Sequence, residues 1–276
     1  MKRKINYVVT VCALACALLN PLAASAKETV RIDCETLPTT DTWIDGTLNV
    51  NEFHYYPIEV LTVGKLTIRV QSFFDYCRAD ILDEDLVSFA VKQYLNGSAG
   101  APATVDFTYY VEPGTYYVRC TGEAGHEGSY RIKALFDEIE STESEPNDDY
   151  TTAYPLQKGI EIYGVHTRED AHDFYTFEVE QGQEVKLTVS VADSFKTHLK
   201  VYDSDLQLLD EIYDGVAFAE AKTYTYQKSL DAGVYYIDMN TIYTDEGAGP
   251  YWIRLGEKTA SQQTESTESD KSSPVS

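Results

Sequence analysis

The chain has 276 residues and a formal net charge of −23 at pH 7, with 45 acidic against 22 basic residues. A surface of this sign repels nucleic acid and anionic lipid and attracts cations. Nucleic-acid binding is therefore disfavoured, whereas cation binding and an acidic face that serves only solubility both stay open.

The first 26 residues have the three parts of a secretory signal peptide. Lys2-Arg3-Lys4 is a positively charged start, Val8 to Leu19 is apolar, and Ala24-Ser25-Ala26 supplies the small residues of a cleavage site. The apolar run is short for a membrane-spanning helix. We therefore expect a secreted, extracellular protein with no membrane insertion after cleavage.

From Trp43 onward the composition is typical of β-strands, with 22 Tyr in the whole chain and many Val, Ile, Thr and Phe. Hardly any stretch has a helical period, and Gly and Pro-Gly pairs separate the segments. The expected strands of the first half are 43–48, 53–60, 65–73, 77–83, 86–94, 104–111, 115–121 and 129–136. Those of the second half are 159–165, 173–180, 184–192, 197–203, 206–213, 222–230, 234–241 and 250–255.

Two segments with few apolar residues divide this pattern. Residues 139–150 read as an acidic linker rich in Ser, Glu, Pro and Asn. Residues 256–276 are rich in Ser, Thr, Glu and Lys, so we expect a disordered tail. A first domain over 27–138 and a second over 151–255 remain.

These two halves repeat one another at an almost constant offset. Ordered matches predict two tandem copies of one all-β domain of about 110 residues, which is within the usual domain size. The matches include Gly46 with Gly164, Tyr56-x-Ile58-Glu59-Val60 with Tyr175-x-Phe177-Glu178-Val179, and Gly114-x-Tyr116-Tyr117-Val118 with Gly233-x-Tyr235-Tyr236-Ile237.

A cluster of oxygen-bearing side chains lies in the linker and at the start of the next long strand. Ca²⁺ takes six to eight oxygen ligands from carboxylates, amides, backbone carbonyls and water. The first copy lacks the cluster, since Asn51 and His54 stand where the second copy has its aspartates. The alternative is a solvated acidic linker. The candidate residues are Glu143, Glu145, Asn147 and Asp148 in the linker, followed by Asp170 and Asp173.

Three motifs resemble the bacterial pre-peptidase C-terminal domain family. They are Glu145-Pro146-Asn147-Asp148, Asp170-x-x-Asp173-x-Tyr175-x-Phe177 and Ala232-Gly233-Val234-Tyr235-Tyr236-Ile237. The second half resembles the family over its full length, whereas the first lacks the Glu-Pro-Asn opening. The resemblance implies two tandem jelly-roll-like antiparallel β-sandwich domains, similar to the collagen-binding domains of clostridial collagenases. It also implies Ca²⁺ in the second domain, bound by Glu143, Glu145, Asn147, Asp148, Asp170 and Asp173.

Three tyrosines are candidate ligand contacts. Strand alternation directs Tyr110, Tyr117 and Tyr236 outward, and an exposed Tyr offers a large apolar area together with a hydroxyl group. The family relatives use exposed tyrosines on such a sheet to hold collagen. If Pro113-Gly114 formed a tight hairpin, Tyr110 would lie across from Tyr117. The alternative is that these are strand-forming residues half-packed on a surface.

Three cysteines remain after the signal peptide: Cys34, Cys77 and Cys120. We interpret them as small buried residues, since no C-x-x-C spacing supports a metal site. A single disulfide between two of the three is the alternative.

The sequence contains no G-x-S-x-G elbow, H-E-x-x-H pair or phosphate-binding loop. We therefore expect no enzyme. The leading function is non-covalent attachment to an extracellular protein, such as a collagen-like one, or to a polysaccharide. The rival is an accessory or chaperone-like partner of a secreted enzyme.

Overall fold

The computed structural model describes residues 29–88, 93–191, 197–213, 222–241 and 248–257, so the predicted signal peptide and nearly all of the predicted tail lie outside it. Within these residues the only helix is η1 (Glu123–Gly125), a single 3₁₀ turn. None of the described residues forms a helix that is long and apolar enough to cross a membrane. The all-β prediction is confirmed.

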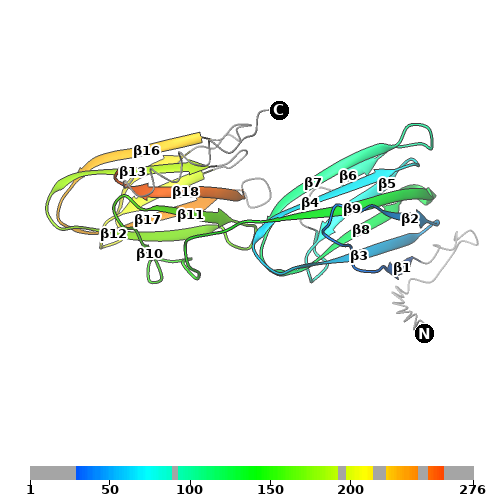
Figure 1. Cartoon of the computed structure of the whole chain (residues 1–276), viewed down its shortest axis with the longest axis horizontal. Coiled ribbons are helices and arrows are strands. Elements are labelled where there is room, and N and C mark those ends of the chain that lie inside the picture. Colours follow the sequence, from blue (N-terminus) through cyan, green and yellow to red (C-terminus); the bar gives the residue numbers. More distant parts are fainter. Residues whose placement is uncertain (1–28, 89–92, 192–196, 214–221, 242–247, 258–276) are drawn as a thin grey trace, which may run out of the picture. The chain divides into compact units, whose positions relative to one another are not determined.

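The chain divides into two compact units that largely follow its halves, and the first is a sandwich of two sheets (Figure 1). Its five-stranded sheet has the order β1-β3-β8-β5-β6, and its four-stranded sheet has the order β2-β9-β4-β7. The strands are β1 (Val30–Asp33), β2 (Ile44–Leu48), β3 (Glu52–Val60), β4 (Gly64–Ser72), β5 (Cys77–Leu82), β6 (Gln93–Leu95), β7 (Ala103–Val111), β8 (Gly114–Gly122) and β9 (Gly128–Glu138).

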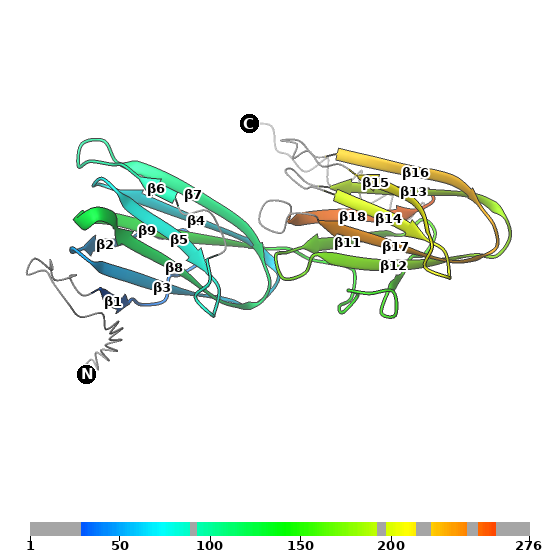
Figure 2. The same ribbon diagram turned by 180° about the vertical axis from the view of Figure 1, so that it is seen from behind.

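The second unit repeats this topology strand for strand, as the view from behind also shows (Figure 2). Its sheets have the orders β10-β12-β17-β14-β15 and β11-β18-β13-β16, so the internal repeat read from the sequence is a repeat of structure. The strands are β10 (Tyr154–Pro155), β11 (Glu161–His166), β12 (His172–Val179), β13 (Gln183–Val191), β14 (Thr197–Tyr202), β15 (Leu208–Tyr213), β16 (Lys222–Leu230), β17 (Gly233–Thr241) and β18 (Gly249–Leu255).

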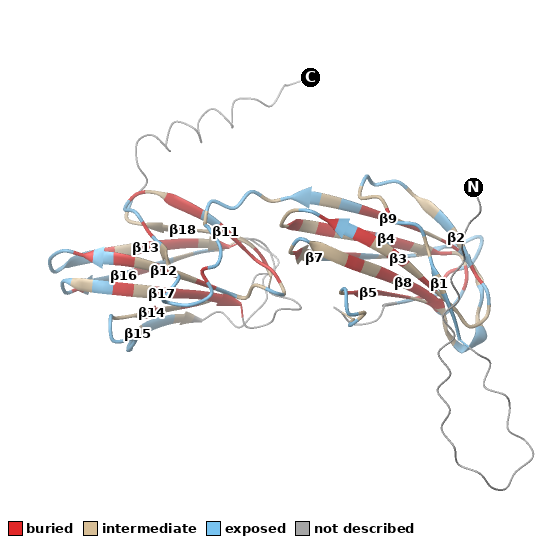
Figure 3. Cartoon of the chain, turned by 90° about the horizontal axis from the view of Figure 1, so that it is seen from below, coloured by how far each residue is buried: buried red, intermediate tan, exposed pale blue. Residues whose placement is uncertain are grey.

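Alternate residues of each strand fill the space between the two sheets of its unit, which gives the banding along the strands in Figure 3. In β4, Leu66, Ile68 and Val70 are fully buried. At the equivalent place in β13, Leu187 and Val189 are 2 % exposed. Burial of these branched side chains is the main term that stabilises each sandwich.

Each unit begins with a short parallel edge strand that the sequence did not indicate. β1 pairs with β3, and β10 pairs with β12. These strands are too short to show alternation, and their pairing is set by the edge they cover. Of the strand expected over 86–94, residues 89–92 lie outside the described residues. Leu86 has a positive φ of 62°, so the extended strand does not begin there, and the described part is β6 (Gln93–Leu95).

Pro113-Gly114 does not form a tight hairpin, so the condition that would place Tyr110 across from Tyr117 is not met. β7 belongs to the four-stranded sheet and β8 to the five-stranded one, so the chain crosses between sheets at Pro113-Gly114. Tyr117 pairs instead with Leu82 of β5. β16 and β17 likewise lie in different sheets, because successive strands of a sandwich can alternate between its layers.

The three cysteines are all free thiols in this structure. Cys77 and Cys120 are fully buried, as expected of small core residues, whereas Cys34 is half-buried and its Sγ lies 3.8 Å from the carbonyl oxygen of Ile32.

Candidate metal centre

The linker is bound to the second sandwich at both ends of its acidic stretch. Beside β11, the amide of Thr142 donates to the carbonyl of Tyr163 at 2.9 Å, and the amide of Tyr163 donates to the Thr142 hydroxyl at 2.8 Å. Beside β12, the amide of Phe174 donates to the carbonyl of Asn147 at 2.8 Å. Residues 142–147 therefore follow the edges of two strands that belong to opposite sheets.

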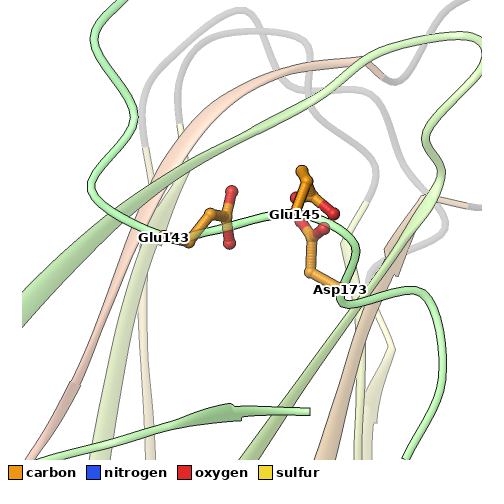
Figure 4. A group of neighbouring side chains, drawn as sticks. All are labelled: Glu143, Glu145 and Asp173. Carbon is orange, nitrogen blue, oxygen red and sulfur yellow. The ribbon is translucent and has the colours of Figure 1, made fainter. Parts of the chain in front are cut away.

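This path brings three carboxylates together (Figure 4). Glu143 and Glu145 come from the linker and Asp173 from the start of β12, and one oxygen of each lies within 4.8 Å of the others. Alternation along an extended segment places Glu143 and Glu145 on one side of the linker. The cluster thus joins the linker to the sheet.

Several oxygens at this place lack a hydrogen-bond partner among the described residues. They are Asp173 Oδ1, Asn147 Oδ1 and Asp170 Oδ1, all shielded from solvent. Asp173 and Asn147 are both 0 % exposed. A buried polar atom without a partner costs free energy, so three acceptors beside clustered carboxylates indicate a missing positive charge.

The other oxygen of Asp173 is held from two sides. Oδ2 accepts a hydrogen bond from the Tyr251 hydroxyl and lies 2.7 Å from His166 Nε2. Tyr251 in turn lies 2.5 Å from the Tyr175 hydroxyl, and Tyr175 donates to Glu143. This buried network fixes the Asp173 carboxylate so that its other oxygen is the one available to a cation.

Gly164 makes room for the network. A Cβ atom there would lie 2.4 Å from Tyr251 Cζ and 2.5 Å from Glu143 Oε1, well inside van der Waals contact. The matched glycine of the first unit, Gly46, has the same relation to Tyr130, with 2.4 Å to its Cζ. The repeated glycine is therefore explained by a repeated buried tyrosine.

Burial, and then crowding of the carboxylates, raise the pKa values of Glu143, Glu145 and Asp170. Burial, and then the charges of Asp173 and Glu145, raise the pKa of Glu143 to about 8. Burial, and then the charges of Asp173, Glu145 and Asp148, raise the pKa of Asp170 to about 9. Burial and the neighbouring acids also raise the pKa of Glu145. A bound divalent cation would lower these pKa values, because its positive charge favours the ionised carboxylates.

The donor set fits Ca²⁺. The cluster and the three unpartnered atoms are all oxygens from carboxylates or an amide, and hard cations prefer such ligands. Of the six predicted residues, Glu143, Glu145 and Asp173 form the cluster, and Asn147 donates hydrogen bonds to Glu143 and Glu145. Asp170 Oδ1 is shielded from solvent, and burial and then the charges of Asp173 and Glu145 raise the pKa of Asp170. Asp148 is exposed and acts on the others through its charge.

The first unit builds the same core network with a histidine in place of the aspartate. The Tyr56 and Tyr130 hydroxyls lie 2.7 Å apart, like those of Tyr175 and Tyr251 in the second unit. His54 takes the place of Asp173, with Nδ1 2.7 Å from the Tyr130 hydroxyl. The other ring nitrogen of His54, Nε2, lies 3.4 Å from Glu52 Oε2, so the network of the first unit pairs a single carboxylate with an imidazole.

Sequence reasoning missed Tyr175, Tyr251 and His166 as parts of this site. The two tyrosines could have been found from the repeat, because both copies have Tyr at the equivalent positions of β3 and β12 and of β9 and β18. His166 gives no such signal. It ends β11, and only the sandwich brings it against Asp173.

The three candidate ligand-binding tyrosines lie apart. Tyr117 and Tyr236 occupy equivalent outward positions on β8 and β17, the central strands of the five-stranded sheets, whereas Tyr110 is on β7 in a four-stranded sheet. All three are half-buried. Tyr236 lies between Thr176 and Tyr202 across the ladder, with the Tyr150 ring 6.0 Å away.

One comparison by sequence bears on the family. The chain is 22% identical over 227 residues to Collagenase ColA of Clostridium perfringens (strain 13 / Type A), a match that covers 78% of this chain and 20% of the collagenase. The chain thus spans about a fifth of that relative's length. No protein-family model matches. The resemblance to collagenase-associated domains is confirmed.

Solved structures show limited similarity. The pre-peptidase C-terminal domain of a Bacillus anthracis collagenase is 17% identical, with a TM-score of 0.32, and the match covers 41% of this chain and 98% of that one. Tandem CBM51 modules of a Streptococcus pneumoniae family 98 glycoside hydrolase are 9% identical, with a TM-score of 0.26, over 81% and 88% of the two chains.

Proposed function

We propose that the protein is a secreted, non-catalytic binding module whose second sandwich is stabilised by Ca²⁺. The observation that carries the proposal is the group of three carboxylates with three shielded, unpartnered oxygens beside it. Clustered acids that need a cation suit an extracellular environment, where calcium is abundant enough for weak sites of 10⁻⁴–10⁻³ M.

Calcium would hold the linker to the second sandwich. Glu143, Glu145 and Asn147 belong to the linker, whereas Asp170 and Asp173 precede or begin β12. A cation bound by both sets would cross-link two segments that otherwise repel each other. We assign the ion a structural role, because it would join the linker to the start of β12, which contains Asp173.

The binding role rests on the relation to a collagenase and on the two equivalent tyrosines. Tyr117 and Tyr236 present aromatic area on the central strands of the five-stranded sheets, where an elongated ligand could lie across the strands. A collagen-like protein is the first ligand to test, followed by cell-wall polysaccharide. Tyr110 is the third candidate contact, on the opposite sheet of the first unit.

The test is retention of the purified protein on immobilised collagen and on insoluble polysaccharides, with calcium and with chelator. Retention that falls about tenfold in Tyr117→Ala or Tyr236→Ala, at unchanged melting temperature, supports the proposal. Tyr163→Ala is the matched control, since Tyr163 is 44% exposed on the other sheet of the second unit. If the protein bound no polymer and one enzyme co-purified with it from spent medium, the function of an accessory protein would replace the proposed binding function.

A further inference from the structure

Two half-exposed tyrosines lie at the β6 edge of the five-stranded sheet in the first unit. Tyr94 of β6 is 55% exposed, and Tyr76, directly before β5, is 50% exposed. The Tyr76 amide donates to Asn96 Oδ1 at 3.1 Å, so the segments that carry the two tyrosines lie side by side. Large aromatic side chains that are exposed together mark an interaction site more often than single ones do.

Tyr76 has a backbone conformation that a bulky residue rarely adopts. Its φ of 56° lies in the left-handed region. Two contacts fix it there: the Glu123 amide donates to the Tyr76 carbonyl at 3.0 Å, and the His126 ring packs against the Tyr76 ring with 4.7 Å between centroids. Such a conformation persists where the surrounding structure holds it, and residues of this kind concentrate at ligand-binding sites.

Two glycines let the neighbouring loops pack tightly. A Cβ atom at Gly122, the last residue of β8, would overlap the carbonyl oxygen of His126. One at Gly97, directly after Asn96, would overlap the carbonyl oxygen of Ser72. Backbone segments in such close contact have little room to move, so Asn96 and His126 are positioned before any ligand arrives. A preorganised site loses less entropy on binding.

The charged groups next to the tyrosines pair with one another. Arg78 stands across from Tyr94 in the ladder between β5 and β6. Its Nη1 lies 2.7 Å from Glu123 Oε1, and its Nε lies 3.2 Å from Asp80 Oδ2. Arg119 Nη2 also lies 2.5 Å from Asp80 Oδ2. Two guanidinium groups therefore meet two carboxylates, and this network is neutral.

The rim of this region is acidic. Asp75 precedes Tyr76, Glu127 follows His126, and both acids are exposed in a chain whose net charge is −23. An anionic ligand is therefore repelled. A cationic ligand would meet the guanidinium of Arg78, so the place between the tyrosines suits an uncharged ligand.

We propose that Tyr76, Tyr94, Asn96 and His126 form a binding site for a neutral oligosaccharide. A tyrosine ring offers a large apolar face to the C–H side of a pyranose, and its hydroxyl group bonds to sugar hydroxyls. The Asn96 side-chain amide adds donors, and the Glu123 carboxylate, which is 34% exposed, adds acceptors. This site goes beyond the proposed function and shares no residue with it.

The site lies on the same sheet as Tyr117 but at a different place along its strands. Arg78 pairs with Thr121, whereas Leu82, four residues farther along β5, pairs with Tyr117. At about 3.4 Å per residue the two places are about 14 Å apart. Retention on collagen would depend on Tyr117 and Tyr236, so it would persist if this inference failed.

Isothermal titration calorimetry of the purified protein with cellohexaose, maltohexaose and chitohexaose tests the proposal. At least one of them should bind, and Tyr94→Ala should weaken that binding about tenfold or more. Tyr76→Asn should weaken it as much without lowering the melting temperature, because Asn tolerates a positive φ better than Tyr does. Tyr163→Ala removes a tyrosine that is 44% exposed in the second unit, and it should change the affinity by less than about twofold.

Three outcomes would each overturn the proposal. They are absence of binding by all three neutral hexasaccharides, equal losses in Tyr94→Ala and Tyr163→Ala, and binding of the cationic probe hexalysine that falls as strongly in Tyr94→Ala. Melting temperature identifies any Tyr94→Ala protein that has lost its fold, and in that case Tyr76→Asn decides.

Discussion

Calcium should raise the melting temperature of the second unit and leave that of the first unchanged. Oxygens of the Glu143 and Asp173 carboxylates lie within 4.8 Å of each other, where two ionised groups would repel by about 3.5 kcal/mol at an effective dielectric constant of about 20. Without a cation the pKa of Glu143 is raised, and this carboxyl group holds a proton at neutral pH. Burial is the largest cause of the raised pKa values of Glu143 and Asp170, and the charges of the neighbouring carboxylates add to it. Ca²⁺ replaces this repulsion with attraction.

The size of the effect follows from mass action. For a site of about 10⁻⁴ to 10⁻³ M, about 10 mM Ca²⁺ stabilises the folded unit by about 1.4–2.7 kcal/mol. In a domain of about 100 residues this corresponds to a rise of about 5–15 °C. Mg²⁺ should give less, because it demands a smaller octahedral site and loses its water reluctantly.

Differential scanning calorimetry in chelator and in CaCl₂ measures the shift. Leu66→Ala and Leu187→Ala assign the two transitions, since these leucines fill equivalent core positions of the two units. Glu143→Gln should abolish the shift while keeping the side-chain volume. A second-unit transition that is the same in chelator and calcium, or a shift that survives Glu143→Gln, would refute the reasoning.

The remaining predictions follow from the repeated core. Gly46→Ala and Gly164→Ala should each lower the free energy of unfolding by about 1–3 kcal/mol, because each new Cβ meets a tyrosine ring at 2.4 Å. Only Gly164→Ala should also reduce the rise in melting temperature that calcium causes. Denaturant unfolding measures both losses of stability. Leu187→Ala should lower the stability of the second unit by about 2–5 kcal/mol in the same assay, and a loss under 1 kcal/mol would contradict the assigned core. Burial lowers the pKa of His54 despite the nearby Glu52, so the first unit should be fully stable above about pH 6.5 and lose stability as pH falls below it. His54→Gln should remove that dependence in a pH series of melts, and an unchanged acid loss would show that another group causes it.

The sequence by itself determined the all-β class, most strand positions and the existence of two copies. The alternation of residues such as Leu66, Ile68 and Val70 predicts directly which side chains are buried, because the two-residue period of a strand depends only on neighbouring positions in the sequence. The matched Tyr56 and Tyr175 report the repeat. The acidic residues that the fold collects were also visible in the sequence, since most of them lie within one short segment of the linker.

Only the tertiary structure decided which sheet each strand joins and which atoms meet. Tyr110 and Tyr117 looked like partners because Pro113-Gly114 separates them, yet the chain crosses between sheets there. His166 reaches Asp173 only because β11 and β12 come from opposite sheets of one sandwich. Sheet pairing depends on contacts between segments distant in sequence, and local pattern carries no record of those contacts.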